Sequence, residues 1–490
     1  VPGLSSGVGV LDANDTYSDY GVVGFFGRFN YSFDEKYLLE FNGRYDGSSR
    51  FPKESRFGFF PSVSGAWRLS NESFMNPLSG IVSNMKIRGS YGEIGNQDIS
   101  NYGYLPTMNS YNVDWISSNT GINAVSLSQP KLVSGSFTWE RVRTLDIGVD
   151  LGFFDDRLTA NVDWFNRQTL DMLAPGSELP AVLGGSPPLS NVADLSNKGW
   201  ELSMLWRDDI NDFNYSLGFN LFDSQAEITD YDNEEGLLNQ HYVGKQIGEI
   251  WGYVTQGFYT VDDFEDESLN SDLTGGVLLD NVAPFEGTNP NPGDIRYRDL
   301  NGDGIVNDGN NTLMDPGDQQ IIGNSTRRFQ FGFTGSASYK NFDLSIFVQG
   351  IGKRDLWYGN SPEIFPFTHR WTTVYAHQLD YWMPDNTDAF YPRNYAYGLG
   401  NYRHSRKVQT KYLLNGAYLR LKNITIGYSL PQNLLDRLKI SRLRVFVTGE
   451  NLINLDHLPD GLDPELSKVT GSEGNYPFLK NYSVGLNVTF

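Results

Sequence analysis

The last nine residues of the chain alternate strictly between large apolar side chains and small or polar ones. The even positions are Tyr482, Val484, Leu486, Val488 and Phe490. Successive side chains of a β-strand point to opposite faces, so this segment predicts a strand with one apolar and one polar face. The pattern is typical of a strand in a membrane-spanning barrel, but soluble antiparallel sheets also alternate. Its repetition along the chain has to separate these two interpretations.

The alternation recurs from one end of the chain to the other and predicts thirteen strands. It is clean in Thr144–Phe153 and in Phe213–Leu221. Near Asn423 the phase slips, because Leu421 is at an odd position and Ile424 at an even one, which predicts a β-bulge. The other copies are Val23–Phe33, Tyr37–Tyr45, Phe59–Leu69, Met85–Tyr91, Leu158–Trp164, Trp200–Trp206, Phe329–Tyr339, Phe342–Val348, Leu443–Gly449 and a strand around Ile424.

Composition narrows the classes of protein that this chain can belong to. Hydrophobic residues make up 39% of the chain, and no run of about 18 apolar residues occurs, so a barrel is the expected way for it to cross a bilayer. The formal charge is −21, from 38 Lys and Arg against 59 Asp and Glu, which argues against nucleic acid as a partner. The absence of cysteine fits an oxidising compartment.

The connections between the predicted strands alternate between short and long. The short set is 34–36, 71–84, 155–157, 208–212, 340–341 and 431–440. The long set is 47–56, 92–137, 169–191, 224–328, 350–415 and 451–481. Outer-membrane barrels have short periplasmic turns and long outer loops. The sequence therefore predicts an all-β, transmembrane antiparallel barrel, surrounded by outer-membrane lipid, with extracellular loops and its C-terminus at the periplasmic side.

Two features indicate that the predicted barrel is larger than this chain and wet inside. Thirteen is an odd number, whereas single-chain bacterial barrels have an even number of strands, and the chain starts at Val1 without a Met or a signal segment. We therefore expect a processed chain or a piece of a longer protein. Charges of both signs occupy the inward positions and predict a hydrated interior: Arg28, Glu40, Arg44, Lys86, Arg88, Asp146, Asp150, Glu201, Asp343, Arg444 and Glu450.

Several motifs resemble the C-terminal half of SusC-type (SusC/RagA family) TonB-dependent transporters, the outer-membrane nutrient importers of Bacteroidota. The most specific is Pro292–Gly304, PGDIRYRDLNGDG, which is followed by Ile321–Asn324. Other matching segments are Tyr45–Phe51, Tyr418–Tyr428, Val447–Leu452 and the C-terminal strand. Together they span nearly the whole chain.

The resemblance implies a 22-stranded barrel with an N-terminal plug inside it. The thirteen predicted strands would be the last thirteen, and the plug, the segment that contacts TonB and the first strands would be absent from this chain. The resemblance also implies a TonB complex as energy source and a SusD-like lipoprotein as lid. The cargo would be an oligosaccharide or a peptide, and no cofactor would be required.

The segment that starts at Asp299 resembles a calcium-binding loop. Asp299, Asn301 and Asp303 are spaced like the first oxygen ligands of an EF-hand, but Asn310 replaces the acid at position 12. Asp318 is a candidate for the missing oxygen, and Asp315 is an alternative. We expect either a structural calcium ion in this outer loop or an Asx-rich turn that satisfies its own backbone.

Aromatic side chains in the predicted loops are candidates for stacking on sugars or peptides. They are Tyr111, Trp115, Trp251, Tyr253, Trp357, Tyr358, Phe365, Trp371 and Trp382. The alternative is that most of these rings pack loop against loop or against the lid protein.

No sequence motif indicates catalysis. The chain lacks an HExxH motif and a phosphate-binding glycine loop, and its scattered serines show no nucleophile elbow, so we expect that it is not an enzyme. The first hypothesis is a nutrient importer. The alternatives are a surface adhesin or structural barrel that binds a partner through its loops, and a soluble β-enzyme acting on glycans.

Overall fold

The computed structural model describes residues 17–116, 123–135, 137–176, 179–184, 187–359, 361, 364–365, 374–395, 403–435, 440–466 and 478–490. Within these ranges thirteen strands form one antiparallel sheet, in the order β1-β2-β3-β4-β7-β8-β9-β10-β15-β16-β19-β20-β21. Their bounds are β1 Val22–Phe33, β2 Tyr37–Ser48, β3 Phe57–Arg68, β4 Val82–Asn96, β7 Glu140–Phe153, β8 Leu158–Pro175, β9 Leu189–Ile210, β10 Phe213–Tyr231, β15 Arg328–Tyr339, β16 Phe342–Lys353, β19 Tyr418–Ser429, β20 Arg442–Asp456 and β21 Asn481–Thr489.

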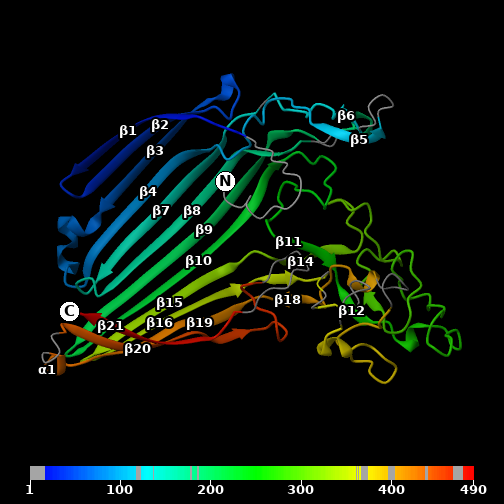
Figure 1. Cartoon of the computed structure of the whole chain (residues 1–490). Coiled ribbons are helices and arrows are strands. Elements are labelled where there is room, and N and C mark those ends of the chain that lie inside the picture. The colour runs from blue at the N-terminus through cyan, green and yellow to red at the C-terminus, as the bar shows by residue number, and fades with distance from the viewer. Residues whose placement is uncertain are drawn as a thin grey trace.

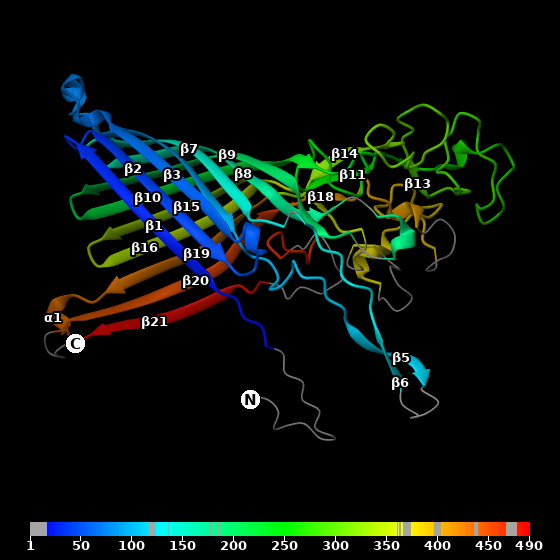
Figure 2. The ribbon, with the colours of Figure 1, turned by 90° about the horizontal axis from the view of Figure 1, so that it is seen from above.

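Each strand of this sheet pairs with the next one along the chain, which confirms the predicted thirteen-stranded, all-β architecture. Figures 1 and 2 show a curved sheet whose edge strands are β1 and β21. The predicted bulge is also confirmed, because the register of β19 shifts against β16 and against β20 on either side of Lys422.

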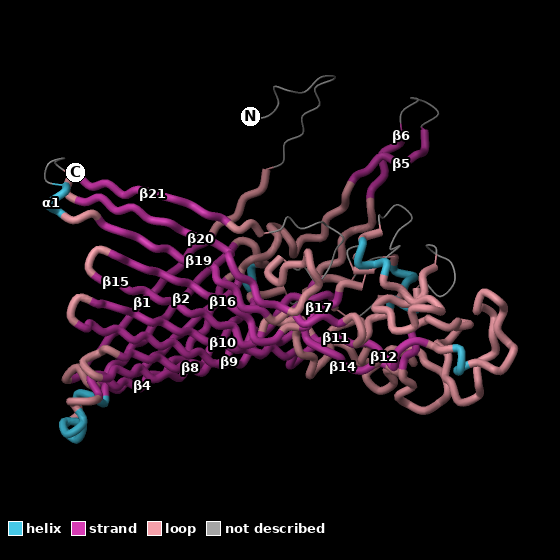
Figure 3. Tube along the Cα trace, turned by 90° about the horizontal axis from the view of Figure 1, so that it is seen from below, coloured by secondary structure: helices cyan, strands magenta, loops and turns pink. Residues whose placement is uncertain are grey.

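The remaining elements are small and lie mostly among the long connections. Four two-stranded ribbons pair β5 with β6, β11 with β14, β12 with β13 and β17 with β18. Their bounds are β5 Ser110–Ile116, β6 Asn123–Leu127, β11 Glu249–Tyr253, β12 Thr255–Phe258, β13 Ile295–Tyr297, β14 Gln319–Asn324, β17 Asp355–Trp357 and β18 Leu413–Asn415. Figure 3 shows that helix is confined to short pieces, α1 at Gln432–Leu435 and 3-10 turns at Lys53–Ser55, Leu69–Asn71, Ser73–Leu78, Ala181–Leu183, Val261–Asp263, Ala376–Leu379 and His404–Arg406.

No helix among the described residues is long and apolar enough to cross a membrane.

The short connections all lie at one end of the sheet, here called the turn end, and the long ones at the other, the loop end (Figures 1 and 2). Tight turns need positive backbone φ angles, which Asp34, Glu35, Asn211 and Lys340 supply at φ of 51°, 54°, 54° and 52°. The predicted alternation of short and long connections is therefore present in the fold.

Several strands run further toward the loop end than the alternation of side chains predicted. The loop predicted at 169–191 is shortened to 176–188, since β8 continues to Pro175 and β9 begins at Leu189. The loop predicted at 224–328 likewise begins later, because β10 continues to Tyr231. Where a strand extends past the apolar environment, both of its faces can be polar. Its backbone hydrogen bonds therefore continue although its side chains no longer alternate between apolar and polar.

Candidate functional site

One face of the sheet carries a network of ion pairs, and we call it the inner face. The guanidinium of Arg88 on β4 lies 3.2 Å from Asp146, 3.1 Å from Asp150 and 2.5 Å from Asp163, while Lys86 lies 2.5 Å from Asp150. Arg88 thus reaches β7 and also β8, which is two strands away. Side chains converge in this way on the concave face of a curved sheet, so the predicted inward positions of these charges are confirmed.

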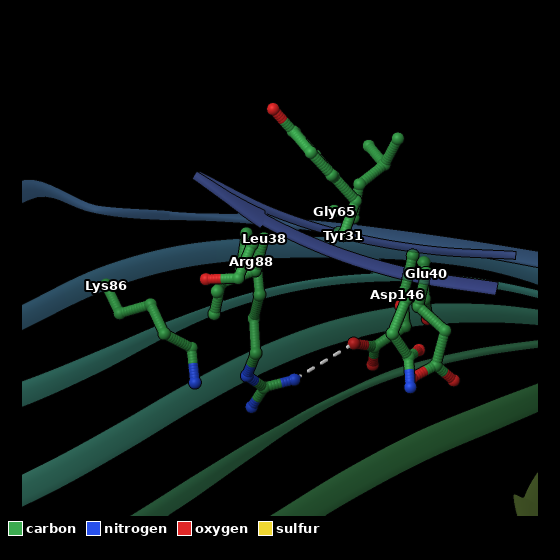
Figure 4. Close-up of a pocket in the computed structure, with 14 residues that line it drawn as sticks. Tyr31, Leu38, Glu40, Gly65, Lys86, Arg88 and Asp146 are labelled. Carbon is green, nitrogen blue, oxygen red and sulfur yellow. Dashed lines mark hydrogen bonds and ion pairs between the residues drawn. The ribbon is translucent and has the colours of Figure 1, made fainter. Parts of the chain in front are cut away.

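Figure 4 shows Glu40, Lys86, Arg88 and Asp146 projecting from this face, whereas Tyr31 projects from the opposite one. Glu40, Lys86, Arg88 and Asp146 line a hollow of about 460 Å³ that is bounded by β1, β2, β3, β4 and β7. The same face carries ion pairs at its other side, where Arg444 on β20 lies 2.5 Å from Asp343 on β16. Partly exposed charges of both signs keep this surface hydrated.

A row of hydroxyl side chains crosses the inner face between β10 and β21. Register pairs connect its members directly across five strand–strand contacts. The row is Ser216, Ser336, Ser345, Thr425, Thr448 and Ser483. Sequence reasoning missed it, because its members lie on six strands and only the register aligns them. The inner face therefore has an ion-pair network around β4 and β7, and between β10 and β21 a hydroxyl row beside the Arg444–Asp343 ion pair.

The opposite face of the sheet is apolar and exposed. On β21 the exposed fractions are 74% for Tyr482, 75% for Val484 and 64% for Leu486. Aromatic rings flank the turn end, with Tyr339 50% and Phe342 57% exposed. A continuous apolar surface with aromatic rings along its border has the composition of the lipid-facing side of a membrane barrel.

At the loop end the long connections form a hydrophobic cluster of their own, which we call the loop core. It brings together segments that are distant in sequence, and its members are Tyr253, Phe285, Ile295, Tyr297, Val306, Ile364, Phe365, Tyr391 and Tyr412. Polar contacts tie it together, since the Tyr253 hydroxyl donates to Asp308 and Gln409 donates to the hydroxyl of Tyr297 at 3.0 Å. The loops are thus a packed body rather than independent excursions.

The nine candidate aromatic residues occupy different environments. Tyr253, Phe365 and Trp382 are 1%, 2% and 4% exposed, so their rings pack against other loop residues. Trp357 packs beside the loop core, with its ring 6.1 Å from that of Phe365, and Tyr358 packs there too.

Two of the candidates lie nearer to solvent. Trp251 is half-buried and donates to Tyr242 at 3.0 Å and to Glu249 at 2.9 Å. Tyr111 on the β5–β6 ribbon is 52% exposed, which leaves its ring open to a partner. The backbone of Trp115 belongs to β5, but its side chain is not described, and Trp371 lies outside the described residues. Stacking on a ligand stays a prediction for all nine.

The calcium-like segment forms an Asx-rich turn in which carboxylates accept backbone hydrogen bonds. Asp299 accepts from Gly302 at 2.6 Å and from Gly304 at 2.9 Å, and Asp303 accepts from Ile305 at 2.9 Å. The nitrogen of Asp303 donates to Asn301 at 3.0 Å. These contacts are those of an Asx-rich turn, the predicted alternative to a calcium site.

Asp318 closes the same segment. Its side chain is fully buried and accepts from Leu300 at 2.6 Å and from Asn307 at 2.8 Å. In the described ranges no three His, Cys, Asp or Glu side chains are grouped as a metal site would require. A structural calcium ion at Asp299, Asn301, Asp303 and Asp318 stays a prediction.

Burial shifts the pKa values of several groups in the loops. It raises the pKa of Tyr391 to about 12, with Asp380 contributing. It also lowers the pKa of His404, whose ring centroid lies 5.0 Å from that of Phe285, and the nearby cations Lys407 and Arg403 lower it further. These shifts follow from packing, and none of them marks a catalytic pair.

Comparison with known proteins identifies the class of barrel. The family described as TonB dependent receptor-like, beta-barrel matches residues 2–349, and the chain belongs to this family. It is 29% identical over 99% of its length to TonB-dependent receptor P3 of Formosa agariphila. It is 28% identical over 96% of its length to TonB-dependent receptor SusC of Bacteroides thetaiotaomicron. The barrel is therefore of the SusC type, as the motifs indicated, and receptors of this family are outer-membrane proteins.

A solved structure of the RagAB peptide transporter has the same fold. It superposes on 96% of this chain with a TM-score of 0.71 at 23% sequence identity. The chain spans 48% of the length of that structure's chain, and 47% and 44% of the two relatives. It thus corresponds to about half of each protein that it matches.

Proposed function

We propose that this chain is the barrel wall and the outer loop body of an importer that takes up oligosaccharides or peptides across the outer membrane by TonB-dependent active transport. The observation that carries the proposal is the two-sided sheet. One face is apolar and exposed, while the other carries the Arg88 ion-pair network and the hydroxyl row. A wall of this kind separates lipid from a hydrated passage for polar solutes.

The proposal places the loop end outside the cell and the C-terminus at the periplasmic side. Its partners would be a SusD-like lipoprotein over the loops and a TonB complex that acts through the part of the protein outside this chain. The Bacteroides relative of the SusC type and the fold shared with the RagAB peptide transporter support these partners. We expect no enzymatic activity.

Uptake by cells tests the proposal. Deletion of the gene for the full-length protein should abolish accumulation of a labelled oligosaccharide or peptide mixture, and a protonophore should do the same in wild-type cells. Complementation with the full-length gene should restore uptake. Normal uptake together with lost attachment to a surface would contradict the proposal and favour the adhesin.

The two labelled mixtures also separate the substrate classes. A transporter for glycans should leave peptide uptake unchanged when it is deleted, and a transporter for peptides should leave glycan uptake unchanged. Cells that carry a deletion of an unrelated outer-membrane receptor provide the matched control for membrane integrity.

A further inference from the structure

The segment 457–466, here called the strap, follows β20 and connects the loop end of the sheet to the loop core. In Figure 2 the orange-red chain after β20 turns back at this end. Gly461 has a φ of 94°, a conformation that glycine adopts without strain, and Pro459 and Pro464 stiffen the segment on either side. The strap therefore has a restricted backbone.

Two carboxylates of the strap meet two cations on the inner face of β19. Asp463 lies 2.7 Å from Arg420, while Glu465 lies 3.0 Å from Arg420 and 2.6 Å from Lys422. This arrangement lies at the bulge, where Lys422 is the extra residue of β19 against β16. The phase slip in the sequence thus marks the point where β19 holds the strap.

The other contacts of the strap lead to the loops. Leu462 packs against the loop core, and Pro464 is fully buried. The carbonyl of Pro464 accepts a hydrogen bond of 3.2 Å from the side chain of Arg354, a residue that is only 6% exposed. The strap consequently ties the loop core to the barrel wall through a few residues.

The ion pairs at β19 differ in their access to water. The side chain of Arg420 is 2% exposed, whereas those of Lys422, Asp463 and Glu465 are 20%, 17% and 15% exposed. Salt or a competing charge can therefore reach the carboxylates, and release of the strap would give water access to Arg420. Loss of the carboxylates would leave a buried charge on Arg420, while the more accessible pair of Lys422 weakens as the salt concentration rises.

We propose that the strap is a reversible ionic latch. Arg420 and Lys422 are positioning residues that hold the loop core against the inner face, and the latch opens when a solute passes from the loops into the barrel. This inference rests on the proposed transport function, but its first readout does not require transport.

A cysteine reporter in the full-length protein tests the latch. Leu462→Cys places a thiol on the strap, in a chain that has no cysteine of its own, and any cysteine elsewhere in the protein would be replaced. An impermeant maleimide should label this thiol slowly in the purified protein. Asp463→Asn combined with Glu465→Gln removes all three ion pairs and should speed labelling at least about tenfold, because the buried Arg420 is then left without its carboxylate partners. Raising the salt concentration to about 1 M should produce an increase in the same direction but smaller, because the buried Arg420 is screened less than Lys422.

Matched variants separate the latch from general loosening. Asp266→Asn combined with Glu267→Gln removes two exposed loop carboxylates away from the strap and should leave the labelling rate unchanged. Lys422→Arg keeps the charge and should also label slowly. Retention of the heat-resistant barrel band on gels shows that each variant has folded. Wild-type labelling rates in the folded double variant and at high salt would overturn the latch.

Measurement in cells tests whether the latch opens during transport. With substrate present, the reporter should be labelled faster in energised cells than in cells treated with a protonophore. Equal rates in cells that take up substrate normally would show that the strap is a fixed brace, and would overturn the proposal while leaving transport intact. Absence of uptake in wild-type cells would instead contradict the proposed function itself.

Discussion

Aromatic side chains of the sheet and of the loop core occupy opposite environments. On β1, Phe25 is 64% and Phe29 is 59% exposed, whereas Phe365 and Tyr412 in the loop core are 2% and 1% exposed. In the sheet the backbone ladder holds the strands together, so apolar side chains are free to face lipid. In the loop core only short ribbons such as β12–β13 and single bridges join the segments, so burial of the rings carries more of the stabilisation. The same residue types therefore indicate lipid in one region and a packed core in the other.

The largest expected effect is a loss of loop packing that spares the sheet. Phe365→Ala removes a ring that lies 4.8 Å from that of Tyr412 and should destabilise the loop core by about 3–5 kcal/mol. Hydrogen exchange should show faster opening of the segments around Tyr253 and Tyr297, with unchanged protection in β4 and β7. Equal loss of protection in the sheet would contradict the separation of the two regions.

A charge on the apolar face should have a somewhat smaller effect, and it should act on the sheet alone. Ile346 faces outward near the middle of β16, and its neighbour Ser345 faces inward in the hydroxyl row. Ile346→Arg should lower the free energy of unfolding of the barrel in lipid by about 2–4 kcal/mol, since a lipid-facing cation near the midplane is costly. Urea titration of the full-length protein in vesicles measures this loss. Ser345→Arg is the matched control, and an equal loss there would mean that the two faces are wrongly assigned.

The smallest effect is a pH dependence confined to the loop core. Because the pKa of His404 is lowered from its ordinary value of 6.5, the unfolded segment binds a proton at a higher pH than the folded one. Stability is therefore complete above about pH 6.5 and decreases as the pH falls toward the lowered pKa. Hydrogen exchange of the loop core between pH 7.5 and about pH 5, corrected for intrinsic rates, checks the sign. His404→Gln should reduce this dependence in the loop core.

Local patterns in the sequence were enough to predict the strands of the sheet and the order of its connections. Alternation predicts strands such as Val23–Phe33, which is β1 at Val22–Phe33, connection lengths predict one turn end and one loop end, and the slip at Asn423 predicts the bulge. These properties are local because the period of a strand is two residues, so a few neighbouring side chains reveal it. The inward charges could be assigned for the same reason.

Contacts between distant segments were decided only by the tertiary structure. The burial of Tyr253, Phe365 and Trp382, the hydroxyl row and the meeting of Asp463 with Arg420 depend on register or on loop packing. A single sequence contains no signal for such pairs, because their separation along the chain has no period and loops have no repeating geometry. The sequence thus determined which face of each strand meets lipid, and the fold determined which loop residues meet one another.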